Sequence, residues 1–271
     1  MAKIAVIGVC GQSTFLTVDK FHELGETKFA KSCFQEIGGK GSNQAIAAAR
    51  MGAQVSFLGA VGDDSVGTRC KETLEKEGIC GCFAVNPGKE TTFAFILTDE
   101  KGENRVTCYT GAELTTQDVE GFRDSIVGAD ILLLNNEVPE DVNAKAIEIA
   151  KAHGVPVILN PAPAREGSED VWLVTPNEQE RAGLQATYQH CITTLGGEGC
   201  SIDDRVKIPA LPVVAVDTTG AGDTFNGVLA VCLAEGMDME GACRLAVKAS
   251  GISVTRKGVL GAIPTREELF A

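Results

Sequence analysis

Short apolar runs alternate with helix-like segments along most of the chain, and this alternation constrains the fold more than any other feature. Runs typical of buried strands occupy residues 3–9, 54–60, 131–135, 155–160, 172–174 and 191–195. Helical patterns occupy residues 43–51, 66–77, 141–152, 178–184, 223–235 and 239–255. Strands that alternate with helices form βαβ units, in which helices cover both faces of a parallel sheet. We therefore expect an α/β fold in three layers, an α/β/α sandwich around a mostly parallel central sheet.

Two stretches break this alternation. Residues 12–36 include "HELGETKFAKSCFQE", which alternates like a strand, and residues 91–110 predict a hairpin with its turn at 99–104. Neither stretch has a helical partner. We expect the two to form a small β-sheet that stands off the main sheet as a lid, within a single domain over residues 1–271.

Composition narrows the classes of partner and location. The chain has 24 Lys and Arg against 37 Asp and Glu, a net charge of −13, which argues against a nucleic-acid partner. No apolar run reaches the ~20 residues that span a bilayer, so we expect no membrane segment. The ten cysteines form no C-x-x-C pair and no secretory signal precedes them, which predicts reduced thiols in a cytoplasmic protein.

A glycine-rich turn, "VDTTGAGDTFNGVLA" at residues 216–230, leads into an apolar helix. The N–H groups of Gly220, Ala221 and Gly222 are expected to converge on one spot, where the helix dipole favours negative charge. Asp223 can then accept a proton from a substrate hydroxyl. The alternative is that Asp223 only caps the helix, but the three small residues before it favour an anion site.

A second glycine-rich stretch, "EIGGKGSNQAIAAARMGA", covers residues 36–53. It is not a Walker A loop, because Lys40 is followed by Gly41 and not by Ser or Thr. Gly38, Gly39 and Gly41 allow a ligand to approach closely, and Asn43 can hydrogen-bond its hydroxyls. A plain glycine turn before a well-packed helix is the alternative for this stretch alone.

Together these two stretches resemble the two signature patterns of the ribokinase-like carbohydrate kinases, the PfkB family, and the similarity is closest to ribokinases. Further similar segments follow in the family's order over almost the whole chain. They are "NPAPA" at 160–164, "TPNEQE" at 175–180, "TTLGGEG" at 193–199 and "VTRKG" at 254–258. The resemblance implies the sandwich with a β-lid, often a homodimer formed through that lid, and transfer of the γ-phosphoryl group of ATP to a sugar or sugar-like hydroxyl.

The resemblance also assigns roles to particular residues. It implies that Asp223 is the catalytic base and that Gly220, Ala221 and Gly222 form the anion hole. Positions that match the acceptor side are Gly39, Lys40, Asn43 and Glu137. Positions that match the nucleotide side are Asn177, Thr194 and Gly196. Positions that match metal sites are Glu180, for Mg²⁺ partly through water, and Asp217 with the backbone near Ser253 and Gly258, for a monovalent cation such as K⁺.

The chain departs from the ribokinase pattern at two places. Ribokinases carry Asn and Asp in a G-S-x-N-x-D pattern after the first strand, where this chain has "GVCGQSTF" with Gly11 and Ser13 at those positions. Ribose is therefore in question as the acceptor, and Gln12 or Asp19 are candidates to substitute. The segment 181–190 is also shorter than the family's, which bears on nucleotide affinity.

The sequence thus predicts an ATP- and Mg²⁺-dependent kinase acting on a primary hydroxyl of a small sugar. A nucleoside kinase with the same machinery is one alternative. A catalytically silent protein that binds sugar or nucleotide is another, although the intact Asp223 turn favours an active enzyme.

Overall fold

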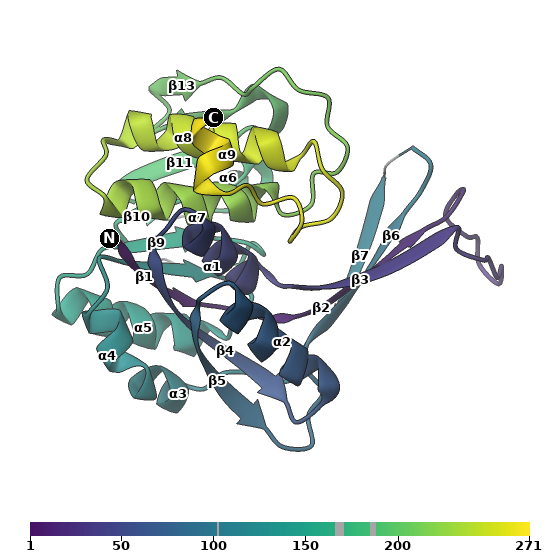
Figure 1. Cartoon of the computed structure of the whole chain (residues 1–271), viewed down its shortest axis with the longest axis horizontal. Coiled ribbons are helices and arrows are strands. Elements are labelled where there is room, and N and C mark those ends of the chain that lie inside the picture. Colours follow the sequence, from purple (N-terminus) through teal and green to yellow (C-terminus); the bar gives the residue numbers. More distant parts are fainter. Residues whose placement is uncertain (102, 166–170, 185–187) are drawn as a thin grey trace.

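The computed structural model describes residues 1–101, 103–165, 171–184 and 188–271. Within these ranges the main sheet has the strand order β13-β12-β11-β10-β9-β8-β1-β4-β5, shown in Figure 1. The strands are β1 Lys3–Ile7, β4 Gln54–Gly62, β5 Cys80–Asn86, β8 Ile131–Asn135, β9 Val157–Asn160, β10 Leu173–Val174, β11 His190–Thr194, β12 Cys200–Ile202 and β13 Val206–Ile208. All neighbouring pairs are parallel except β11 with β12 and β12 with β13. The expected mostly parallel sheet is confirmed.

Helices cover both faces of this sheet. Along β1, Ile4 and Val6 pack into one core cluster and Ala5 and Ile7 into a second, as alternation in a strand buried on both faces requires. The first cluster includes residues of α1 Lys40–Arg50, α2 Ser65–Lys76, α7 Ala221–Ala234, α8 Met239–Ser253 and α9 Arg266–Phe270. The second includes residues of α3 Thr116–Gly121, α4 Arg123–Val127 and α5 Glu140–Ala152. The three-layer architecture is therefore as expected, and every helix in the described ranges is too short or too polar to cross a bilayer.

A second, smaller sheet extends from the body of the molecule (Figure 1). Its strand order is β3-β2-β6-β7, with β2 Gly11–Thr17, β3 Ser32–Gly38, β6 Phe93–Thr98 and β7 Asn104–Tyr109. The register places Glu36, Ser13, Ala94 and Cys108 in one row across the four strands. Residues paired directly across strands share a face of the sheet, so these four side chains lie on the same face. We call it the inner face, because the charges of Lys40 and Glu137 act on Cys108.

The expectation of a strand from residue 22 is wrong, because β3 begins only at Ser32. β3 is an edge strand that pairs with β2, and β2 ends at Thr17 opposite Ser32, so the residues before 32 have no neighbouring strand to pair with. The chain turns at Gly25, whose φ is 78°. A strand needs both an alternating pattern and a neighbouring strand to hydrogen-bond with. Residues 22–31 have the alternating pattern but no neighbouring strand.

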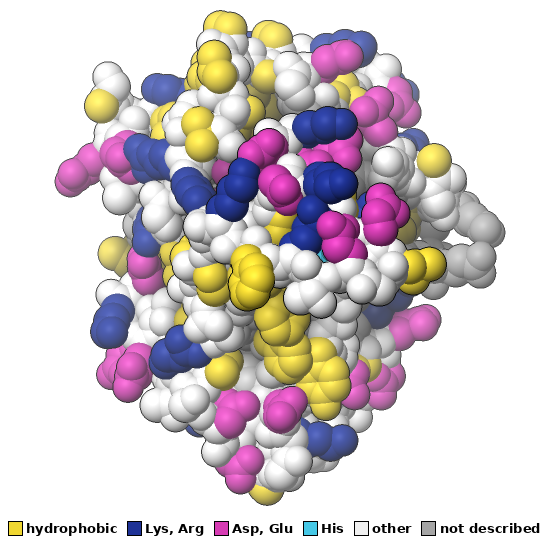
Figure 2. Space-filling view, turned by 90° about the vertical axis from the view of Figure 1, so that its right-hand side faces the viewer, with side chains coloured by type: hydrophobic (Ala, Val, Ile, Leu, Met, Phe, Trp, Pro, Cys, Tyr) yellow, Lys and Arg dark blue, Asp and Glu magenta, His cyan; other side chains and the backbone are white. Residues whose placement is uncertain are grey.

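The outer face of the small sheet carries aromatic side chains. Phe93 stacks on Tyr109 with ring centroids 5.0 Å apart and meets Phe95 edge-on at 5.6 Å. Phe95 and Tyr109 are each 47% exposed. Figure 2, which views the molecule from the end at which the small sheet projects, shows apolar side chains gathered in a strip. Large exposed apolar patches mark sites of interaction with proteins, membranes or ligands.

Candidate active site

The turn before α7 is shaped to present backbone N–H groups to a cavity. Gly220 has φ of 75°, and a Cβ built on it would lie 2.5 Å from Cγ1 of Val259, so glycine is required there. The N–H of Ala221 makes a long bond of 3.3 Å to the carbonyl of Thr218. No hydrogen bond within the described chain uses the N–H groups of Gly220 or Gly222, and both residues line the cavity. Two unpaired donors at a helix N-terminus can bind an anion.

Asp223 lies in the first turn of α7 and is 6% exposed. Its Oδ2 accepts a bond of 2.8 Å from the Asn43 side chain and its Oδ1 one of 3.1 Å from Gln44. The helix is capped by Gly220 without a side-chain bond, so the interpretation of Asp223 as a simple helix cap is wrong. The two amides instead orient its carboxylate.

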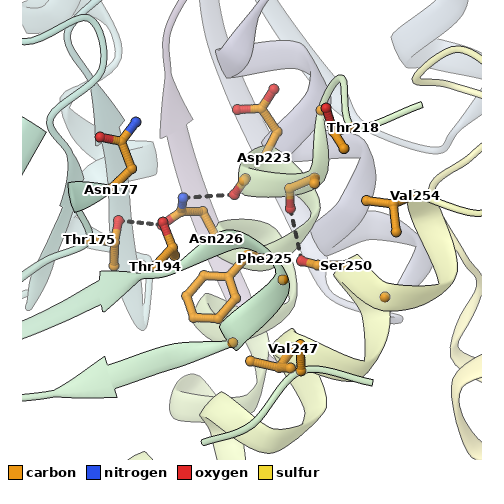
Figure 3. A pocket seen from close by; sticks show the side chains of 18 of the residues that line it. Thr175, Asn177, Thr194, Thr218, Asp223, Phe225, Asn226, Val247, Ser250 and Val254 are labelled. Carbon is orange, nitrogen blue, oxygen red and sulfur yellow. Dashed lines mark hydrogen bonds between the residues drawn. The ribbon is translucent and has the colours of Figure 1, made fainter. Parts of the chain in front are cut away.

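Hydrogen bonds from the side chains of Asn226 and Ser250 hold the first turn of α7 in place (Figure 3). Asn226 donates to the carbonyl of Gly222 at 2.8 Å and accepts from Thr175 at 2.5 Å. Ser250 donates to the carbonyl of Ala221 at 2.8 Å. Because these carbonyls are held, the N–H groups of the turn keep their direction when a ligand arrives, which is the preorganisation that electrostatic catalysis requires.

The residues expected on the acceptor side lie together at the start of α1. Gly39 has φ of 102° and precedes the helix, and the N–H of Lys40 donates to Oε2 of Glu137 at 2.8 Å. The negative charge of Asp223 is the main cause that raises the pKa of Lys40, and burial opposes it. Asn43 has its Oδ1 buried without a partner, so this oxygen remains able to accept a bond from a ligand hydroxyl.

Burial raises the pKa of Glu137 to about 7. The positive charge of Lys40 opposes this rise, the charge of Asp223 adds to it, and the N–H of Lys40 opposes it. The unfolded chain therefore releases this proton near pH 4.5 and the folded chain only near pH 7. Because the folded state binds the proton more tightly, its stability falls as the pH rises through this window.

Replacing Glu137 with Gln removes this titration. At pH 8 the Glu137→Gln variant is therefore expected to have a larger free energy of unfolding than the wild type. The gain approaches about 3 kcal/mol at most, and it should fall below about 1 kcal/mol at pH 5. Urea unfolding of both proteins at the two pH values measures it, and the other carboxyls cancel in the difference. An equal difference at both pH values would contradict the shifted pKa.

A cavity of about 720 Å³ adjoins the turn, within the size range of small-molecule sites. Asn177, Thr194 and Gly196 line it, as does the Gly220–Gly222 turn, and Figure 3 shows Asn177 across the cavity from Thr218. Thr194 is held by its N–H, which donates to the carbonyl of Pro176 at 2.8 Å. A Cβ on Gly196 would meet nothing within 4 Å, so that edge of the cavity is open.

Asn177 and Glu180 cap the helix α6, Glu178–Gly183. The Asn177 side chain accepts from the N–H of Glu180, and the Glu180 carboxylate accepts from the N–H of Asn177, both at 2.8 Å. Burial raises the pKa of Glu180, and the charges of Lys40 and Asp223 act on it. The described residues contain no cluster of three ligating side chains for a metal ion. A single carboxylate fits Mg²⁺ only when phosphate oxygens and water complete the coordination shell of the ion.

The helix predicted at residues 178–184 is confirmed, because α6 covers Glu178–Gly183. Residues 185–187 of the shortened segment lie outside the described residues.

Asp217 and Gly258, expected to bind a monovalent cation, lie together. Asp217 Oδ1 accepts from the N–H of Thr219 at 3.0 Å and its Oδ2 from the N–H of Gly258 at 3.1 Å. Ser253, in the last turn of α8, uses its hydroxyl to donate to the carbonyl of Ser250 at 2.9 Å. Both carboxylate oxygens of Asp217 thus accept bonds from backbone N–H groups, and carboxylate oxygen is a ligand that hard cations prefer.

Gly11 and Ser13 leave the acceptor side with few hydrogen-bonding groups. A Cβ on Gly11 would lie 2.1 Å from the carbonyl oxygen of Thr92, so a larger residue does not fit in this backbone. Gln12 bonds to Thr14 and contacts Arg69 on the other face of β2. Asp19 lies beyond the end of β2 and pairs with Lys28. Gln12 therefore does not face the site, and Asp19 is engaged by Lys28 beyond the end of the strand.

Sequence reasoning missed three buried amides, two linked to Asp223 and one beside Glu137. Gln44 donates to Asp223 and also to Asn160 at 3.2 Å, and Asn160 in turn donates to the carbonyl of Thr175. Asn135 keeps its Nδ2 buried without a partner beside Gly8. The sequence did carry a signal for Gln44, which is a polar residue among the small residues of the helix "SNQAIAAA". A buried amide is nearly always hydrogen-bonded, so this position indicates a buried partner.

Comparisons with known proteins agree with this geometry. Residues 1–266 match the pfkB family carbohydrate kinases. The chain is 38% identical to the ribokinase of Bacillus subtilis, with 99% of this chain and 98% of that one aligned, and 34% identical to the ribokinase of Haemophilus influenzae over 98% and 96%. Among solved structures, a ribokinase from Thermotoga maritima superimposes with a TM-score of 0.88 at 34% identity over 100% and 98% of the two chains. A ribokinase from Arabidopsis thaliana complexed with ribose and ATP gives 0.83 at 26% over 100% and 98%.

Proposed function

The chain belongs to the pfkB family of carbohydrate kinases and phosphorylates a sugar with ATP, and we propose that Asp223 is the base of that reaction. One observation carries the proposal. A buried carboxylate, oriented by two amides, directly follows a turn with two unpaired N–H groups at the edge of a cavity of about 720 Å³. A base beside an anion site is the arrangement that phosphoryl transfer to a hydroxyl needs.

In this mechanism the acceptor hydroxyl gives its proton to Asp223 as its oxygen bonds to the γ-phosphorus. The bond between that phosphorus and the oxygen of the β-phosphate breaks, and ADP leaves. The N–H groups of Gly220, Ala221 and Gly222 stabilise the negative charge on the transferred group. Asn43 and Gln44 keep the carboxylate in position, and the ammonium of Lys40 supplies a positive charge nearby.

Glu180 is the residue that we propose to hold Mg²⁺, partly through water, with Asn177 and Thr194 beside the nucleotide. Bound with ATP, Mg²⁺ neutralises phosphate charge. Asp217 and the backbone near Ser253 and Gly258 are proposed to hold a monovalent cation such as K⁺. The loop that carries Gly258 packs on Gly220 through Val259, so an ion there would steady the anion site.

The small sheet is proposed to act as a lid over the acceptor, because its inner face is turned toward Lys40 and Glu137. A lid excludes water, which would otherwise compete as the acceptor. We also propose that two copies form a homodimer through the exposed outer face with Phe95 and Tyr109. Sedimentation of the protein at micromolar concentration distinguishes the dimer from a monomer. All ten cysteines are free thiols, and we place the enzyme in the reducing cytoplasm.

The acceptor is tested with a panel of ribose, 2-deoxyribose, other small sugars and nucleosides. We expect ADP to form with at least one sugar, at a rate well above that with any nucleoside, and mass spectrometry to find a monophosphate of that sugar. Turnover with nucleosides alone would replace the sugar by a nucleoside. A shift in melting temperature without turnover for any acceptor would identify a silent binding protein and overturn the kinase proposal.

A further inference from the structure

Glu36 joins the small sheet to a distant loop. It lies on the inner face of β3, and its Oε1 accepts a bond of 2.8 Å from the N–H of Val259 and its Oε2 one of 3.1 Å from the N–H of Leu260. These are hydrogen bonds between residues 223 and 224 positions apart in the chain. A carboxylate that receives two backbone N–H groups, one on each oxygen, fixes the direction of both.

A second contact from the same strand reaches the same loop. Phe34 lies two residues before Glu36 and therefore on the same face of β3. The ammonium of Lys257 lies 5.2 Å from the centre of the Phe34 ring, which is itself stacked on Phe15 at 4.4 Å. Two side chains on the inner face of β3, the ring of Phe34 and the carboxylate of Glu36, thus contact the loop of residues 257–260.

The loop of residues 257–260 also supports the turn of residues 219–222 before α7, which we call the phosphate turn. Val259 packs so closely on Gly220 that a Cβ there would lie 2.5 Å from Cγ1 of Val259. Gly258 donates to Asp217, and the same carboxylate accepts from the N–H of Thr219 at 3.0 Å. The turn is therefore held at Thr219 and at Gly220 by contacts that run through residues 258 and 259.

We propose that Glu36 is a positioning residue that fixes the phosphate turn relative to the small sheet, through residues 258–260. In the proposed function the small sheet covers the acceptor and the phosphate turn binds the phosphoryl group of ATP. The contact of Glu36 with residues 259 and 260 therefore sets the distance between the acceptor hydroxyl and that phosphoryl group. Burial raises the pKa of Glu36 and the charge of Asp217 adds to this, whereas the N–H groups of Val259 and Leu260 oppose it. A buried carboxylate near a second one is costly, and the two N–H bonds offset that cost.

The kinetic test rests on the proposed function and compares Glu36→Gln, Glu36→Ala and the control Glu268→Gln. Glu268 anchors the other end of the same C-terminal segment, through Arg256 and the N–H of Thr265. We expect kcat to fall about 10-fold in Glu36→Ala and less in Glu36→Gln, because a misplaced turn loses stabilisation of the transition state. The acceptor KM should change less than about 2-fold, and Glu268→Gln should lose thermal stability but keep its kcat within about 2-fold. Equal kcat in all four proteins, or the same loss in Glu268→Gln, overturns the proposal.

Hydrogen exchange tests the link without any catalytic activity. In Glu36→Ala the N–H groups of Val259 and Leu260 lose their acceptor and should exchange faster, and the bonded N–H groups of Thr219 and Ala221 should follow. In Glu268→Gln the faster exchange should stay within residues 256–270. Faster exchange at 259 and 260 alone, with Thr219 and Ala221 unchanged, shows that the turn is independent of Glu36. A wild-type protein without kinase activity would contradict the proposed function and leave this measurement valid.

Discussion

Replacing Asp223 with Asn is expected to lower kcat by about 10²–10⁴-fold, the usual contribution of a positioned general base. Asn cannot accept the proton of the acceptor hydroxyl, whereas the cavity for the nucleotide keeps its shape. We therefore expect ATP to bind with nearly wild-type affinity, measured by calorimetry, while ADP formation at saturating substrates almost stops. Turnover near that of the wild type would remove Asp223 from the role of base.

The same variant should lose a modest part of its stability. Asn43 and Gln44 both donate to the carboxylate of Asp223, and an Asn at 223 would turn its own NH₂ group toward one of these donors. One lost bond of this kind costs about 1–3 kcal/mol. Asp238→Asn is the matched control, because Asp238 also lies at a helix start, where it accepts from the N–H of Gly241 at 2.7 Å, but far from the cavity. It should retain full turnover.

The central architecture could be predicted from the sequence because its strands are apolar throughout and its helices are long. β8 was placed at 131–135 and α5 at 141–152, close to their observed bounds. Six strands and α-helices were missed, namely β5, β12, β13, α3, α4 and α9. The missed strands β12 and β13 have three residues each, and the missed helices have five or six. Segments of this length show too few periods for a pattern to appear.

β5 was missed for a different reason. It is the edge strand "CGCFAVN", and its residues are exposed or only partly buried. It therefore lacks the continuous apolar run that marks a strand covered on both faces. Gly81 weakens the pattern further, because glycine is uncommon inside strands.

Within the site, the sequence could locate the residues that follow strand ends but not their partners. Asp223 and its turn were predictable from three small residues before a helix. The bonds from Gln44 to Asp223 and from the N–H of Val259 to Glu36 join residues 179 and 223 positions apart, and no local pattern encodes such a pairing. Asn177 and Glu180 show the opposite limit, because these two side chains form a capping box, a local pattern that any helix could use.

Replacing Gly220 with Ala is expected to lower kcat by about 10–10²-fold, because displacement of the turn removes N–H donors from the charge that develops in the reaction. The left-handed φ of 75° strains any residue with a Cβ. In addition, that Cβ would lie 2.5 Å from Cγ1 of Val259, so either the turn or the 258–260 loop must move. We also expect a loss of about 1–3 kcal/mol in the free energy of unfolding.

Gly236→Ala separates these two effects. Gly236 has φ of 84°, and a Cβ there would meet nothing within 4 Å, so this control carries the backbone strain without the collision. It should lose about 1 kcal/mol of stability and keep its kcat. If Gly220→Ala instead behaves like Gly236→Ala, with lower stability and unchanged turnover, the donors of the turn do not act on the transferred phosphoryl group. The anion hole would then have to be sought elsewhere along the cavity, because turnover does not depend on the geometry that Val259 imposes on this glycine.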